Sequence, residues 1–146
     1  MTVQTTGILS AIVSHAMASG HFERVNSHEP KNAPGNGLTA AVWVDSIGPV
    51  RSSGLAVTSG RLVFNVRLYS GMLQEPADAI DPNLIAATDA LMSAYSGDFD
   101  LGGTVRCVDL LGQAGVPLGA QAGYISHSGT MYRVMTITLP VLVNDA

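Results

Sequence analysis

Three histidines near the start of the chain are the first residues whose chemistry could make a site. His15, His21 and His28 lie six and seven residues apart, and Glu23 and Glu29 could add carboxylates to them. A zinc site needs such side chains to converge on one ion. Neither spacing fits two ligands on one helical face or a zinc-finger pattern. We therefore interpret the histidines as ordinary polar residues and expect no metal or other cofactor.

Cys107, the single cysteine, could be a nucleophile if a histidine lay beside it. It alternates with Val105 and Asp109 in an expected strand, which is typical of a small buried residue. No Gly-x-Ser-x-Gly motif supports a serine nucleophile, and no Gly-Lys-Ser/Thr follows Gly102-Gly103 to hold a phosphate. One cysteine also excludes an internal disulfide.

Asp98 and Asp100 could form a pair of hydrolytic carboxylates. They flank Phe99 in the stretch Gly-Asp-Phe-Asp-Leu-Gly-Gly. Aspartates in such turns hydrogen-bond their own backbone, so we interpret this stretch as a solvated turn. With no catalytic arrangement left, the sequence predicts that the protein is not an enzyme.

The spacing of apolar residues and the capping residues predict two helices near these candidate residues. Apolar residues recur with helical period from Ile8 to Met17, after capping threonines and before Gly20, which predicts a helix over 6–19. A second helix is expected to begin with Asp81 as its N-cap and Pro82 as its first helical residue, and to end at Gly97.

The remaining apolar segments predict strands with hairpin-like neighbours. They cover residues 38–44 (extending as far as 50), 61–70, 104–111, 120–126 and 130–143, and Ser128-Gly129 supplies a turn. Segments 26–37 and 51–60 are rich in turn-forming or small polar residues and are expected to be long loops. The fold class predicted is α+β: one domain over 1–146, with a mostly antiparallel sheet of about five strands and two helices packed on one face.

The composition limits the classes of function. The chain has 146 residues, of which only 12% are charged, and a net charge of −4. Its high apolar content excludes a disordered chain, and its pI of about 5.3 disfavours a domain that grips nucleic acid through its charge. No segment predicts a membrane helix. Globular chains are about 25% charged, so we expect this protein to bury surface in an assembly.

Arginines and aromatic residues on the predicted strands are the candidates for that burial. Arginine and aromatic side chains anchor protein interfaces more often than other types do. The candidate residues for an interface between subunits or with a partner are Trp43, Arg61, Arg67, Tyr69 and Arg133.

Three stretches together resemble a known family. They run from His21 to Val44, from Asn65 to Ser70, and from Gly97 to Gly112. They are similar to tail terminators of siphovirus-like tailed phages that infect actinobacteria, and the resemblance spans most of the chain. The helix-first order and the long closing strand agree with that family.

The resemblance implies a virion protein that forms a homo-hexameric ring at the head-proximal end of the tail. The ring would end polymerisation of the tail-tube protein and join the tail to a head-completion or neck protein. DNA would pass through it without specific binding, which suits a net negative charge. Assembly would take place in the host cytoplasm. Two alternatives stay open: another neck or tail protein, such as a head–tail connector or a tube subunit, and a small ligand-binding domain or enzyme.

Overall fold

The computed structural model describes most of the chain. The described residues are 5–22, 24–27, 38–52, 58–71, 80–98, 100–101, 103, 105, 107–112, 115–127 and 130–143. The elements follow in the order α1 (Thr5–Ala18), β1 (Arg24–Asn26), β2 (Thr39–Ser52), β3 (Thr58–Gly71), α2 (Ile80–Gly97), β4 (Cys107–Val108), β5 (Gly119–His127) and β6 (Thr130–Val143).

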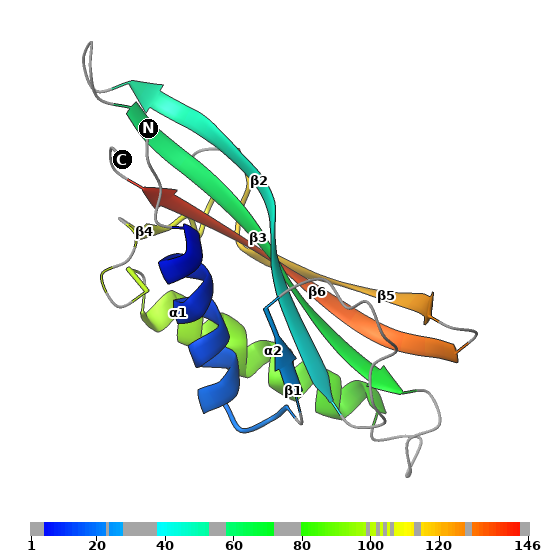
Figure 1. Cartoon of the computed structure of the whole chain (residues 1–146). Helices are drawn as coiled ribbons and strands as arrows, with labels where there is room; N and C mark the ends of the chain where they lie inside the picture. Colours follow the sequence, from blue (N-terminus) through cyan, green and yellow to red (C-terminus); the bar gives the residue numbers. More distant parts are fainter. Residues whose placement is uncertain are drawn as a thin grey trace.

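The strands form one sheet in the order β1-β2-β3-β6-β4, and β5 pairs with β6 below β4. Every pairing is antiparallel except β1 with β2, which is parallel. Both helices lie against the same side of the twisted sheet (Figure 1). The α+β prediction with two helices on one face is confirmed, with six strands in place of about five.

The core lies between the helices and the sheet. In β3, the even-numbered residues Leu62, Phe64, Val66 and Leu68 are all fully buried, as their alternation predicts. Residues of both helices pack against them in one cluster. Burial of each such side chain stabilises the fold by about 1.5–3 kcal/mol.

The first helix begins and ends one residue earlier than predicted. Ile8, Ile12 and Ala16 form its buried line, whereas Met17, expected on the same stripe, is 65% exposed. Gly20 follows the helix with a φ of 74°, in the left-handed region that favours glycine after a helix C-terminus.

The second helix differs from its prediction only at its start. It begins at Ile80, so Asp81 lies in the first turn rather than before it. Pro82 remains in that turn, where its missing N–H breaks no helical hydrogen bond. The helix ends at Gly97 as expected.

Of the described residues within the strand expected over 104–111, only Cys107 and Val108 are strand, so the prediction is wrong for Val105 and for 109–111. Turns lie before β4: Leu101 and Gly103 have φ values of 48° and 86°, and the Asp100 carbonyl accepts bonds from the amides of Gly103 and Val105. The short strand β1 was not predicted, because three residues carry no periodic signal.

The predicted long loops are partly strand. β2 runs on to Ser52 and β3 begins at Thr58, so five of the ten residues in 51–60 belong to the hairpin. Small polar residues pair there through their backbones, which hydrophobic patterning cannot indicate. Asn26 ends β1, and residues 28–37 and 53–57 lie outside the described residues, as does the Ser128-Gly129 turn.

Candidate functional site

The alternation of β3 places several of the candidate residues on one surface. The register of β3 with β6 is uninterrupted, so Arg61, Arg67 and Tyr69 all face away from the helices. Trp43 pairs with Asn65 and shares this face. We call this side of the sheet the helix-free face.

An aromatic cluster lies on the helix-free face. Ala41, Tyr69, Tyr132 and Val134 are buried in it, and Trp43 and Ile125 are partly buried against them. Tyr69 is only 2% exposed. This face therefore has an ordered apolar floor rather than the polar surface that a solvated sheet face usually presents.

Arg67 is held in place on this floor. Its guanidinium carbon lies 5.3 Å from the centroid of the Trp43 ring, and its Nε donates a hydrogen bond of 2.9 Å to Thr136 Oγ1. The cation–ring contact contributes about 0.5–1 kcal/mol at a partly exposed site. The ring contact and one hydrogen bond hold the guanidinium in place, while its terminal nitrogens keep further donors.

A shallow depression lies beside Arg67. It encloses about 330 Å³ and is lined by both polar residues, among them Asn65, Gln121 and Thr136, and apolar residues such as Ile125 and Val134. Its polar residues offer amide, hydroxyl and guanidinium groups to a visiting side chain.

Two of the five candidates lie apart from this depression. Arg61 belongs to the same face but lies under the chain that links β4 to β5, where its Nη1 is 3.0 Å from a Cβ built on Gly115. Arg133 pairs with Ser70 and points to the opposite face. There it lies 4.5 Å from the Tyr124 ring centroid and donates to the Gly123 carbonyl at 3.3 Å.

The two long outer strands of the sheet differ in how they are protected. β2 is covered by β1 at residues 39–41, has a register shift around Asp45 and contains Pro49, all features that hinder further pairing. β5 spans nine residues without Pro, Lys, Arg, Asp or Glu, and no described strand pairs with its outer side. This edge can pair with another chain.

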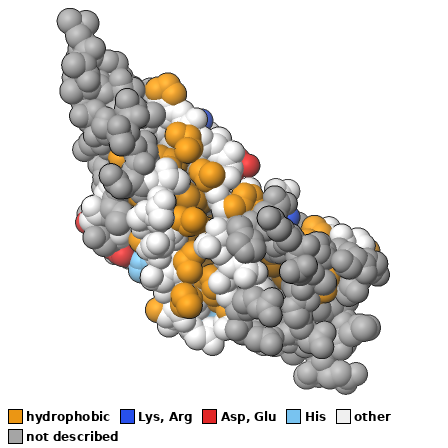
Figure 2. All heavy atoms as spheres, viewed as in Figure 1, with side chains coloured by type: hydrophobic (Ala, Val, Ile, Leu, Met, Phe, Trp, Pro, Cys, Tyr) orange, Lys and Arg blue, Asp and Glu red, His pale blue; other side chains and the backbone are white. Residues whose placement is uncertain are grey.

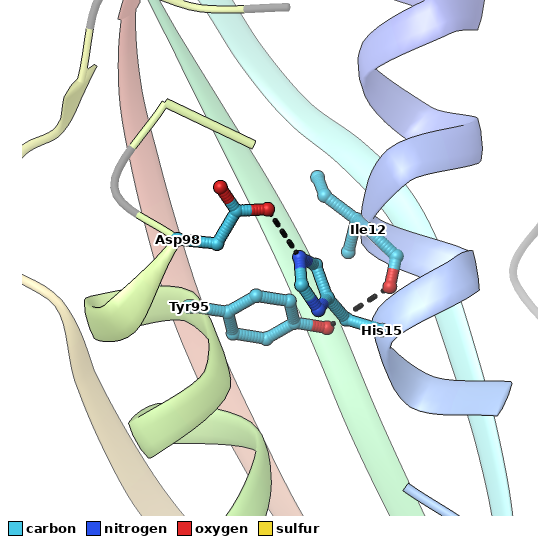
Figure 3. Close-up of polar contacts among 4 residues, drawn as sticks. All are labelled: Ile12, His15, Tyr95 and Asp98. Atoms are coloured by element: carbon cyan, nitrogen blue, oxygen red, sulfur yellow. Dashed lines mark hydrogen bonds and ion pairs between the residues drawn. The ribbon is translucent and has the colours of Figure 1, made fainter. Parts of the chain in front are cut away.

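One polar contact joins the two helices and was not predicted (Figure 3). His15 Nε2 lies 2.8 Å from Asp98 Oδ2, and the His15 ring meets the Tyr95 ring edge-on at 5.7 Å. The Tyr95 hydroxyl donates to the Ile12 carbonyl at 3.2 Å, and burial raises the pKa of this phenol. A histidine three residues after a buried Ile12 was the only hint. The contact joins α1 to the end of α2.

The remaining candidates for chemistry do not converge within the described part of the chain. That part holds no group of three His, Cys, Asp or Glu side chains that could bind a metal ion. His21 is exposed, and His28 lies outside the described residues with Glu23 and Glu29. Cys107 is partly exposed on β4 rather than buried in a longer strand.

The chain turns around Asp98 and Asp100 as predicted, and the hydrogen bonds of this turn join backbone groups rather than the aspartate side chains. Their backbone carbonyls accept hydrogen bonds from Leu101 at 2.9 Å and Gly103 at 3.0 Å. The two aspartates therefore organise a turn, and Asp98 turns its carboxylate to His15. Among the described helices, neither is long and apolar enough to cross a membrane.

A second depression runs along the outer side of α1. It encloses about 380 Å³ between Leu9, Val13 and Ser27, with threonine and serine side chains at its rim. Figure 2 shows hydrophobic side chains gathered along this front of the molecule, between α1 and the β1–β2 edge of the sheet. The depression beside α1 has no charged lining residue and is the more apolar of the two depressions described.

Comparison with known proteins gives likenesses in fold only. No family model and no curated protein matches the chain. One similar solved structure is that of an extracellular contractile injection system, the PVC sheath/tube terminator in its extended state. The match has 12% identity and a TM-score of 0.45, and it covers 99% of this chain but only 59% of that one. Another is the virion of a native gene transfer agent particle, with 10% identity, a TM-score of 0.39 and 92% of each chain covered.

Proposed function

We propose that the protein is a structural component of a phage tail, and more narrowly a tail terminator. Its subunits form a closed ring of six that ends growth of the tail tube and joins the tail to a head-completion or neck protein. The helix-free face carries the proposal: it presents an ordered aromatic floor and a fixed, partly buried Arg67 where a solvated sheet face would be polar.

Three further observations agree with this role. The chain resembles tail terminators over the stretches 21–44, 65–70 and 97–112. Only 12% of its residues are charged, which suits a subunit that buries much of its surface. The net charge of −4 suits a channel through which DNA slides, because phosphate affinity comes from Lys and Arg.

Purified protein tests the assembly. Negative-stain microscopy and sedimentation are expected to show closed rings, singly or in pairs. Long tubes would identify a tube subunit instead, and a monomer at every concentration and salt tested would contradict ring formation.

Phage assembly tests the role. Particles made without the protein are expected to accumulate as separate heads and tails, with tails of irregular length. Adding the protein to uncapped tails of correct length should restore joining to heads. Normal tail length and normal joining without it would show that the chain is not the terminator.

A further inference from the structure

We propose that the helix-free face receives the outer side of α2 from a second copy of the chain, with Arg67 paired to Asp89 of that copy. The inference rests on the proposed ring, for which it supplies the contact. The Arg67 guanidinium on one copy and the Asp89 carboxylate on the next would fix the register between neighbouring subunits.

The charges of the chain are separated between its two layers. Strands β2, β3, β5 and β6 contain the four arginines Arg51, Arg61, Arg67 and Arg133 and one acidic residue, Asp45. Helix α2 contains two aspartates and no lysine or arginine. Because Arg133 points to the opposite face, the helix-free face carries Arg61 and Arg67 among the described residues. Helix α2 carries no cation, so contact between this face and α2 of a second copy is electrostatically complementary.

Arg67 is prepared for such a partner. Within the described residues, its polar and ring contacts are the Thr136 hydroxyl and the Trp43 ring, and neither carries a negative charge. A guanidinium held in a partly buried place gains most from a carboxylate that approaches in its plane. The depression beside it, lined by Asn65 and Gln121, leaves room for that carboxylate.

The outer side of α2 has the matching features. Asp89 is exposed near the middle of the helix, with Ile85 one turn before it and Ser93 one turn after it. Ile85 is 57% exposed, so it adds apolar surface to this side of the helix. Small neighbours such as Ala86 allow a flat surface to approach closely. Ile85 would then pack against Trp43, which is only partly buried against the aromatic cluster.

The two surfaces lie on opposite sides of the molecule. The helices occupy one side of the sheet, and the helix-free face is the other (Figure 1). A contact between them joins different patches on the two copies, so one copy keeps a free helix patch and the other a free sheet patch. Such a head-to-tail contact closes into a ring when the rotation between copies permits.

Charge reversal tests the pair. Arg67→Glu and Asp89→Arg are each expected to weaken ring assembly by at least about tenfold, because each sets like charges against one another. Sedimentation across a concentration series measures the effect, and circular dichroism verifies folding. Asp89 is exposed on a helix, so Asp89→Arg gives a valid reading whatever Arg67→Glu does to the fold. Ala18→Arg, which adds a cation at an exposed place on α1, is the control and should leave assembly unchanged.

Restoration identifies the partners. The double variant Arg67→Glu/Asp89→Arg should recover the ring, and so should an equimolar mixture of the two single variants, since alternating copies satisfy every contact in an even-numbered ring. Rings that keep their affinity in Asp89→Arg, or singles that neither combination rescues, would overturn this contact and leave the proposed function standing. A wild-type protein that never assembles would overturn both.

Discussion

The pair formed by His15 and Asp98 ties the two helices together at their margin. The side chains are 26% and 35% exposed, and their atoms approach to 2.8 Å. Partly exposed pairs of this kind contribute about 0.2–1 kcal/mol. In a double-mutant cycle with His15→Ala and Asp98→Ala, we expect a coupling energy in that range, measured by urea unfolding at pH 6. Coupling of zero would show that the contact does not stabilise the packing of α1 on α2.

Tyr95 gives the fold a dependence on alkaline pH. Burial raises the pKa of its phenol, which stays protonated in the folded state after the unfolded phenol has begun to ionise. The unfolded state then binds fewer protons at Tyr95, so the contribution of this group to stability is constant below about pH 10 and falls above it.

Tyr95→Phe should reduce this alkaline loss. At pH 7 the variant is expected to be less stable by about 1 kcal/mol, because the bond to the Ile12 carbonyl is lost. Above pH 10 its unfolding free energy should fall less steeply than that of the wild type. Denaturant unfolding at a series of pH values measures both, and parallel slopes in the two proteins would contradict the assignment.

Alternate residues of strand β3 face the core on one side of the sheet and the depression beside Arg67 on the other. Phe64 faces the core and is fully buried, whereas its neighbour Asn65 faces the depression beside Arg67. Phe64→Ala should cost about 3–5 kcal/mol of stability because it leaves a cavity. Asn65→Ala is the matched control on the same strand, expected to change stability by less than about 1 kcal/mol. Similar costs at both positions would show that the helix-free face is part of the core.

The whole molecule is expected to fold and assemble without a bound metal. No group of three ligating side chains lies in the described residues, and the histidine spacings of the sequence fit no common site. A chelator should therefore leave both the melting temperature and the ring unchanged. A stoichiometric metal in the purified protein, with a melting temperature lowered by chelator, would contradict this expectation.

The sequence determined the elements with strong periodicity. The buried face of α1 and the alternation of β3 follow from the spacing of Ile8, Ile12 and Ala16 and of Leu62 to Leu68. Such patterns can bury their apolar side chains in one way only, so the α+β class followed from them. Elements without periodicity were not predicted correctly. Strand β1 is too short to show a pattern, and turns at Leu101 and Gly103 precede the strand expected over 104–111.

Residue type suggested the candidate interface residues but could not place them. Trp43, Arg67 and Tyr69 come together because β2 pairs with β3 in one register, and a shift by one residue would send them to opposite faces. Arg133 was chosen for the same reason, yet its own register turns it toward the opposite side. The contact of His15 with Asp98, 83 residues apart in sequence, depends on how α1 packs on α2. Local sequence fixes which atoms are available, while pairing register and helix packing decide which of them meet, because both depend on residues distant in the chain.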